Sequence, residues 1–225
     1  MNQSGSKGAA SQGDGPGFRL PLSRSAPPIV IASASPRRRE LLERVGLPLE
    51  VHAADVDERE QPNETPADYV RRIAHAKAIA VARRSELWVL AADTTVTLDG
   101  AILGKPETPE EAAKMIRWLS GRTHQVMTAY VLIGERDDRT VVREGLVATD
   151  VTMVELDGAM LADYIASGEW RGKAGAYAIQ GIAAGLVREV NGSVTNVIGL
   201  PLAEVLAALR DVGGPVPRFA AGVPA

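Results

Sequence analysis

The sequence of 225 residues predicts an α/β fold with a mixed, twisted sheet and flanking helices. Short apolar runs alternate with segments of helical periodicity through the first half of the chain. Two long runs typical of strands then follow each other with only a short polar turn between them. A purely parallel sheet would need a crossover at that point, so the alternation favours a mixed sheet.

The first half of the chain begins with an apolar run that ends in serines, which predicts a buried strand. Ser35 and Pro36 suit the cap and first position of a helix, and Thr65 opens a capping box. The expected elements are a strand over 28–33, a helix from Pro36 that stops at Gly46, a strand over 47–53 and a helix from Pro66 to about Arg84.

The second half begins with an apolar run that ends in an acid, Asp93. Thr108 opens a second capping box, and Asp157 is a further helix cap. The expected elements are a strand over 87–93, a hairpin about Asp99-Gly100, a helix from Pro109 to Gly121, strands over 124–134 and 143–155, a helix from Asp157 to Ile165, a strand over 183–190, a turn at Asn191-Gly192 and a helix after Pro201.

Composition divides the chain into a folded domain and two tails. Residues 1–27 are rich in Gly, Ser, Pro and Gln, which predicts a disordered N-terminal tail. The segment 213–225 is similar, and we expect a flexible C-terminal tail there. One compact domain over 28–212 is then expected.

Composition also excludes several classes of function. Cysteine is absent, which excludes disulfides, thiolate metal sites and cysteine nucleophiles, and three histidines argue against a multi-histidine zinc site. The net charge of −3 argues against bulk binding to nucleic acid or to anionic membranes. We see neither a signal peptide nor an apolar run near the roughly 18 residues of a membrane span, so a cytoplasmic location is expected.

The run Ser33-Ala34-Ser35-Pro36 leads a strand directly into a helix, and Arg37, Arg38 and Arg39 follow. Free N–H groups at a helix start attract anions, and cations there call for a compensating anion such as phosphate. A solvated basic turn, or pairing with Glu40 and Glu43, explains the arginines equally well.

Lys77 falls within the apolar stripe of the helix that begins at Pro66. A lysine in that position usually extends to the surface, and from the residues alone this interpretation is favoured. The alternative is that its ammonium leans over the edge of a pocket toward an anion.

Asp93 stands at the exit of a buried strand, a position suited to catalysis or metal binding in an α/β fold. Glu58, from the acidic run 55–60, could join it around a hard cation such as Mg²⁺. The alternatives are a turn cap for Asp93 and a solvated loop for the run, and the solvated loop is favoured for the run as a whole.

Two glycine-containing segments and one histidine complete the candidates. Lys105, between Gly104 and Pro106, can reach a phosphate, although the Walker pattern is absent. The loop 172–181 allows close backbone approach, and Gln180 could read a base edge; a plain tight loop is the alternative. His124 has no obvious partner and is expected to be structural.

Together these segments resemble the Maf family of nucleoside triphosphate pyrophosphatases, from about Ile29 to Leu209. The motifs that carry the resemblance occur in family order: ASASPRRRELL, AADTTV, GKP, LSGRTHQVMTA, GKAGAYAIQG and NVIGLPL. The resemblance implies an α/β fold with a central cleft, similar to that of the inosine triphosphate pyrophosphatases. It also implies hydrolysis of a nucleoside triphosphate to the monophosphate and pyrophosphate with Mg²⁺ or Mn²⁺.

The resemblance assigns roles to individual positions. Asp93 matches the family's proton acceptor, and we expect it to hold the metal, with Glu58 as a second ligand. Three positions associated with substrate choice carry residues that look like the dTTP/UTP subgroup, and the remaining candidates surround the phosphates. The expected substrate-binding residues are Ser33, Arg37, Arg38, Lys77, Thr94, Lys105 and Gln180, with Arg37, Thr94 and Gln180 as the specificity positions.

Two other functions stay open. The first is an enzyme for 7-methyl-GTP or for a broad range of nucleotides. The second is a nucleotide-binding regulator without turnover, because the resemblance carries an association with inhibition of septum formation. A homodimer is expected as the commonest oligomer, and three adjacent arginines on an acidic chain make nucleic-acid binding the weakest interpretation.

Overall fold

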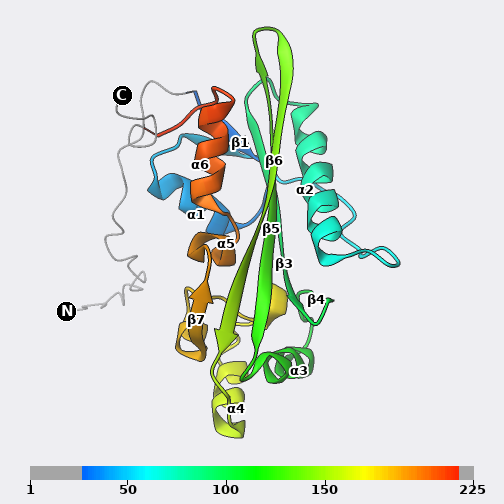
Figure 1. Cartoon of the computed structure of the whole chain (residues 1–225), viewed down its shortest axis with the longest axis vertical. Coiled ribbons are helices and arrows are strands. Elements are labelled where there is room, and N and C mark those ends of the chain that lie inside the picture. The colour runs from blue at the N-terminus through cyan, green and yellow to red at the C-terminus, as the bar shows by residue number, and fades with distance from the viewer. Residues whose placement is uncertain (1–26, 218–225) are drawn as a thin grey trace, which may run out of the picture.

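A computed structural model describes residues 27–217, and the predicted N-terminal tail falls outside these residues except for Pro27. The fold is α/β, with a seven-stranded mixed sheet in the order β2-β1-β3-β5-β6-β7 and β4 paired to β3 (Figure 1). The elements are β1 (Ile29–Ile31), α1 (Pro36–Arg44), β2 (Leu49–Val51), α2 (Pro66–Ala82), β3 (Val89–Leu98), β4 (Ala101–Leu103), α3 (Pro109–Leu119), β5 (Thr123–Arg136), β6 (Arg139–Met153), α4 (Gly158–Ala166), the 3₁₀ segments η1 (Ala174–Ala176) and η2 (Ile182–Leu186), β7 (Val187–Asn191), α5 (Val194–Ile198) and α6 (Leu202–Asp211).

The sheet is mixed because the two long strands β5 and β6 are joined by a tight turn and not by a crossover helix, as the sequence indicated. β1 pairs in parallel with β2 and β3, and helices make those crossovers. The other neighbours in the sheet are antiparallel: β5 pairs with β3, β6 with β5, and β7 with β6. Two-residue turns at Asp99-Gly100 and Asp137-Asp138, all four residues with positive φ, close the hairpins as type I′ geometry requires.

Three helix starts confirm the predicted caps. The side chains of Thr65, Thr108 and Asp157 each accept a hydrogen bond from a backbone N–H three residues ahead. Ser35 occupies the cap position of α1, but its side chain makes no cap bond. That helix start is held instead by Ser33, whose Oγ accepts the Ser35 N–H at 3.2 Å.

One predicted strand was wrong in part, and one short helix was missed. The strand expected over 183–190 begins at Val187, because the apolar residues before it form the 3₁₀ turn η2 and pack into the core. The short helix α5 was missed, since five residues present too little periodicity to predict a helix. Residues 213–217, assigned to the C-terminal tail, include buried Pro215, and Val216 packs against the core.

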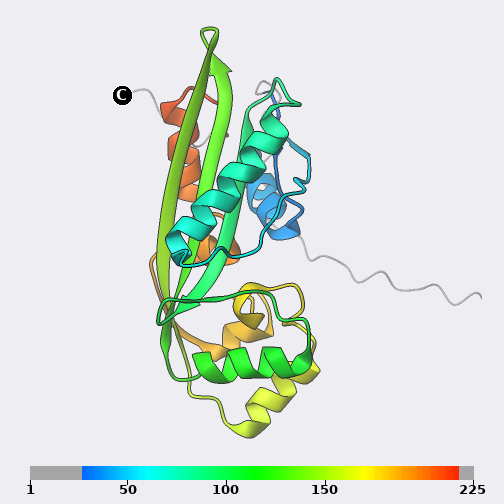
Figure 2. The same cartoon turned by 90° about the vertical axis from the view of Figure 1, so that its right-hand side faces the viewer.

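The long strands link three apolar clusters. α2 covers one face of the upper sheet, and α1 and α6 cover the other (Figures 1 and 2). The lower ends of β3, β5 and β6 pack with α3, α4 and the 3₁₀ segments in a separate cluster. No helix among residues 27–217 combines the length and the apolar character needed to cross a bilayer.

One edge of β3 has no strand partner among the described residues over a short stretch, between the part of the sheet covered by α1, α2 and α6 and the part packed with α3 and α4. β5 pairs with β3 from Val89 to Thr97, so β1 and β4 share the opposite edge. On that edge β1 pairs only through Leu90, and β4 begins at Val96. Over residues 91–95, here called the β3 gap, no strand in the described part of the chain covers this edge.

Candidate active site

A cavity of about 330 Å³ opens beside the β3 gap, which is within the size range of small-molecule sites. Its walls come from the β1–α1 loop with the start of α1, the loop between β2 and α2, α2, β3, the loop after β4, the loop that contains η1, and α5. All nine residues predicted for the site line it: Ser33, Arg37, Arg38, Glu58, Lys77, Asp93, Thr94, Lys105 and Gln180. The fold therefore gathers residues from six separate segments.

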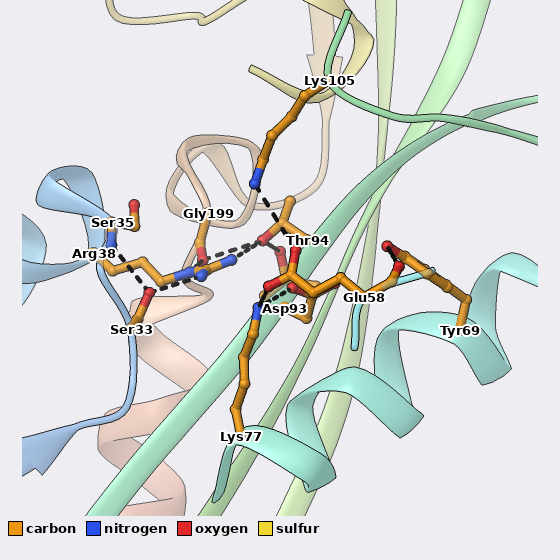
Figure 3. Close-up of polar contacts among 11 residues, drawn as sticks. Ser33, Ser35, Arg38, Glu58, Tyr69, Lys77, Asp93, Thr94, Lys105 and Gly199 are labelled. Atoms are coloured by element: carbon orange, nitrogen blue, oxygen red, sulfur yellow. Dashed lines mark hydrogen bonds and ion pairs between the residues drawn. The ribbon is translucent and has the colours of Figure 1, made fainter. Parts of the chain in front are cut away.

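Lys77 is buried rather than extended to the surface, so the interpretation favoured from the residues alone was wrong. Its Nζ donates to Asp93 Oδ1 at 2.8 Å and lies 2.6 Å from Glu58 Oε1 (Figure 3). The stem of the side chain lies in the apolar stripe of α2, and the ammonium passes beyond that stripe into the cavity. One lysine thus joins the two candidate carboxylates.

Glu58 alone of the acidic run lines the cavity. Burial acts to raise its pKa, but the hydrogen bond and charge of Lys77, with further help from Lys105 and Arg38, bring the pKa below its ordinary value. Tyr69 on α2 fixes the loop by donating from its hydroxyl to the Glu58 carbonyl at 3.0 Å. Asp57 turns away and pairs with Arg59, as the solvated-loop interpretation predicted.

Arg38 is buried, and each of its guanidinium nitrogens has a protein partner. Nε donates to the Gly199 carbonyl at 2.7 Å, Nη1 to Ser33 Oγ at 3.0 Å and Nη2 to Thr94 Oγ1 at 2.9 Å (Figure 3). Burial lowers its pKa, while the charges of Asp93 and Glu58 act in the opposite direction. Arg38 therefore ties three walls of the cavity together.

Three further cations line the cavity around this pair of carboxylates. Arg37 is half-buried, and burial lowers its pKa. Lys105 is exposed, with its Nζ 3.9 Å from Glu58 Oε2. Lys173, which the sequence argument did not single out, has a pKa lowered by burial and by the charge of Arg37. Such a group of cations suits a polyanion.

The loop over 172–180 forms a further wall of the cavity and carries Gln180 at its exposed end. Tyr164 donates to the Ala176 carbonyl at 2.9 Å, and Ala176 itself has a positive φ. His124 lies 2.7 Å from the Tyr177 hydroxyl through Nε2, and it is buried, as expected of a structural residue. The buried side chains of Tyr164 and His124 thus hold this loop in place through hydrogen-bond contacts.

The sequence argument missed Tyr69, Lys173, the Gly199 carbonyl and Thr128, whose Oγ1 lies 2.8 Å from Thr94 Oγ1. Lys173 stood inside a segment already noted for its glycines, so its charge was the available signal. Thr128 is an unremarkable position within an apolar strand, and a backbone carbonyl carries no residue-type signal. Only the pairing of β3 with β5 brings Thr128 beside Thr94.

Comparisons with known proteins agree with this arrangement. The profile of the family described as Maf-like protein matches residues 28–212. A protein of Anaeromyxobacter dehalogenans (strain 2CP-1 / ATCC BAA-258) named dTTP/UTP pyrophosphatase is 50% identical over 192 residues, which cover 85% of this chain and 97% of the relative. A protein of Myxococcus xanthus (strain DK1622) with the same name is 49% identical over 190 residues, covering 84% and 94%.

Among solved structures, the Ham1 protein of Staphylococcus aureus matches with 21% identity and a TM-score of 0.39. The match covers 59% of this chain and 77% of that one.

Proposed function

The chain belongs to the Maf-like protein family, and we propose that it hydrolyses dTTP and UTP to the nucleoside monophosphate and pyrophosphate. Relatives about half identical over almost their whole length carry the name of that activity. The observation in the structure that supports it best is the contact of Lys77 with both Asp93 and Glu58 in a cavity lined by further cations. The cavity also contains Arg37, Thr94 and Gln180, the three specificity positions.

The carboxylates fit a divalent cation of the Mg²⁺ type. Within residues 27–217 no group of three or more acidic or histidine side chains is arranged around a metal position. Mg²⁺ usually needs only one or two carboxylates, since water and substrate phosphates complete its shell. Asp93 and Glu58 would hold Mg²⁺ or Mn²⁺, which when bound neutralises phosphate charge.

The protein's own residues then account for the reaction. Arg37, Lys105 and Lys173 hold the triphosphate, and the Asp93 carboxylate accepts a proton from water. The oxygen of that water forms a bond to the α-phosphorus while the bond to the bridging oxygen breaks, so pyrophosphate leaves. Lys77 keeps Asp93 and Glu58 in position. Positioning and charge stabilisation do most of the work in such reactions.

A nucleotide panel tests this function. Pyrophosphate release is measured for dTTP, UTP, CTP, ATP, GTP and 7-methyl-GTP, each with Mg²⁺, Mn²⁺ or EDTA. We expect dTTP and UTP to give the highest kcat/KM and EDTA to abolish release. A preference for 7-methyl-GTP would overturn the assignment to the dTTP/UTP subgroup. Nucleotide binding without pyrophosphate release in Mn²⁺ would favour a regulator. The homodimer, the cytoplasmic location and the domain limits at 28 and 212 stay predictions.

A further inference from the structure

The long connection between β2 and α2 carries Glu58 but has little structure of its own. Residues 52–65 form neither helix nor strand, and over residues 53–60 no backbone group is hydrogen-bonded to another backbone group of the described chain. Connections of this length without secondary structure are uncommon in compact domains and are usually functional. Side chains must therefore hold Glu58 at the cavity.

Two side chains of α2 hold the main chain at this point. The Tyr69 hydroxyl donates to the Glu58 carbonyl at 3.0 Å, and Arg72 Nη2 donates to the carbonyl of the next residue, Arg59, also at 3.0 Å. One helix thus supplies donors to two successive carbonyls of the connection. Figure 3 shows Glu58 extending from the Tyr69 hydroxyl toward the Lys77 ammonium, which lies 2.6 Å from its carboxylate.

Both donors are themselves fixed. Glu64 accepts from Arg72 through both carboxylate oxygens, at 2.6 Å from Nε and 2.7 Å from Nη2, and the Glu64 side chain is only 8% exposed. The Arg72 guanidinium lies 5.6 Å from the centroid of the Tyr69 ring, within the range of a cation–π contact. Burial, together with the charges of Asp93 and Glu58, raises the pKa of Tyr69 to about 12, so its hydroxyl keeps the hydrogen that it donates.

We propose that Tyr69, supported by Arg72, is a positioning residue that sets the affinity of the cavity for a divalent cation by holding Glu58. The proposal rests on the proposed function, in which Glu58 and Asp93 hold the cation, and deepens it. A carboxylate on an untethered connection must be ordered when it binds an ion, and this loss of conformational freedom opposes binding. The Tyr69 hydroxyl fixes the Glu58 backbone before the ion arrives, so less ordering remains to be done.

The test measures Mn²⁺ binding to the full chain without nucleotide, from the EPR signal of the free ion. Tyr69→Phe removes only the hydroxyl. Tyr130→Phe is the matched control, because Tyr130 lies on β5 in the apolar cluster with residues of α1 and α6. Arg72→Lys is a second variant, which keeps the charge opposite Glu64 but loses the guanidinium fork. Thermal unfolding shows that each variant is folded, and Arg72→Lys carries the test if Tyr69→Phe does not fold.

We expect Tyr69→Phe to raise the dissociation constant for Mn²⁺ by about three- to tenfold, the value of one neutral hydrogen bond, and Tyr130→Phe to leave it unchanged. The affinity for the α,β-imido analogue of UTP in EDTA, measured by calorimetry, should stay at the wild-type value, because other side chains hold the triphosphate. An unchanged Mn²⁺ constant in Tyr69→Phe would overturn the proposal. An equal loss of affinity for the metal-free analogue would also overturn it, since that loss indicates a general distortion of the cavity.

Failure of this positioning role is distinguishable from failure of the proposed function. If the wild-type chain binds Mn²⁺ but releases no pyrophosphate from any nucleotide of the panel, the proposed function fails, and a weaker Mn²⁺ affinity in Tyr69→Phe still supports the role of Tyr69. If the wild-type chain releases pyrophosphate and Tyr69→Phe binds Mn²⁺ as tightly, the function stands and the positioning role is wrong. A wild-type chain that binds no Mn²⁺ overturns the positioning role as well.

Discussion

Lys77 on α2 and Asp93 on β3 form an ion pair in which both side chains are about nine-tenths buried, with 2.8 Å between Nζ and Oδ1. The pair joins the helix layer to the central strand of the sheet. Because water is largely excluded there, removing either partner would leave the other charge buried without compensation and would destabilise the fold. Glu58, on an exposed loop, contacts the same ammonium. Lys77 therefore both stabilises the fold through its pair with Asp93 and holds the two carboxylates of the cavity.

Replacing Asp93 by Asn should abolish most pyrophosphate release without unfolding the protein. The amide keeps the size of the side chain but is far too weak a base to take a proton from water. A fall in kcat by about 10²- to 10⁴-fold is expected for the loss of a general base. Steady-state kinetics and circular dichroism measure the two effects, and a folded variant with wild-type kcat would disprove the assigned role.

Replacing Lys77 by Met should destabilise the fold, because it leaves the buried Asp93 carboxylate without its cation. Breaking a buried pair from one side costs about 3–5 kcal/mol in the free energy of unfolding. Urea denaturation measures the loss. Lys105→Met is the matched control, since the Lys105 side chain is 64% exposed and little change is expected there. Equal losses in the two variants would contradict the buried-pair account.

Replacing Arg38 by Lys should also destabilise the fold, although it keeps the charge. A lysine cannot satisfy Ser33, Thr94 and the Gly199 carbonyl together in the fork geometry of a guanidinium. A loss of about 3–6 kcal/mol is expected from two charge-assisted hydrogen bonds. Arg39→Lys is the control, because Arg39 makes an exposed pair with Glu43 that is worth about 0.5 kcal/mol or less. Urea denaturation of both variants provides the comparison.

His124 should make the fold less stable as the pH falls from 7 to 4.5. Burial lowers its pKa from 6.5 to about 4, so the unfolded chain binds a proton in this range and the folded chain does not. Linkage predicts a loss on the order of 2 kcal/mol, which levels off below pH 4. His124→Phe should remove this part of the pH dependence in denaturant unfolding. Tyr177→Phe should retain it, since burial and not the hydrogen bond causes the shift.

Much of the site follows from the sequence because its residues stand at element boundaries with clear local signals. Asp93 ends an apolar run, Arg37 follows Ser-Pro, and Lys105 lies between Gly and Pro. The direction of Lys77 could not be predicted, because a lysine in an apolar stripe can end at the surface or in a cavity. Burial of Arg38 likewise depends on the Gly199 carbonyl, 161 residues away along the chain.

The β3 gap has a consequence for ligand recognition. Trp88 and Leu90 direct their carbonyls toward β1, and strand alternation therefore directs the main-chain groups of Ala92 and Thr94 to the same side, where β1 has ended. Peptide N–H and C=O groups of the chain itself thus stand at the cavity as fixed donors and acceptors. Substitution by any residue other than proline leaves them in place, so this part of the cavity lining is set by the path of the backbone and not by residue type.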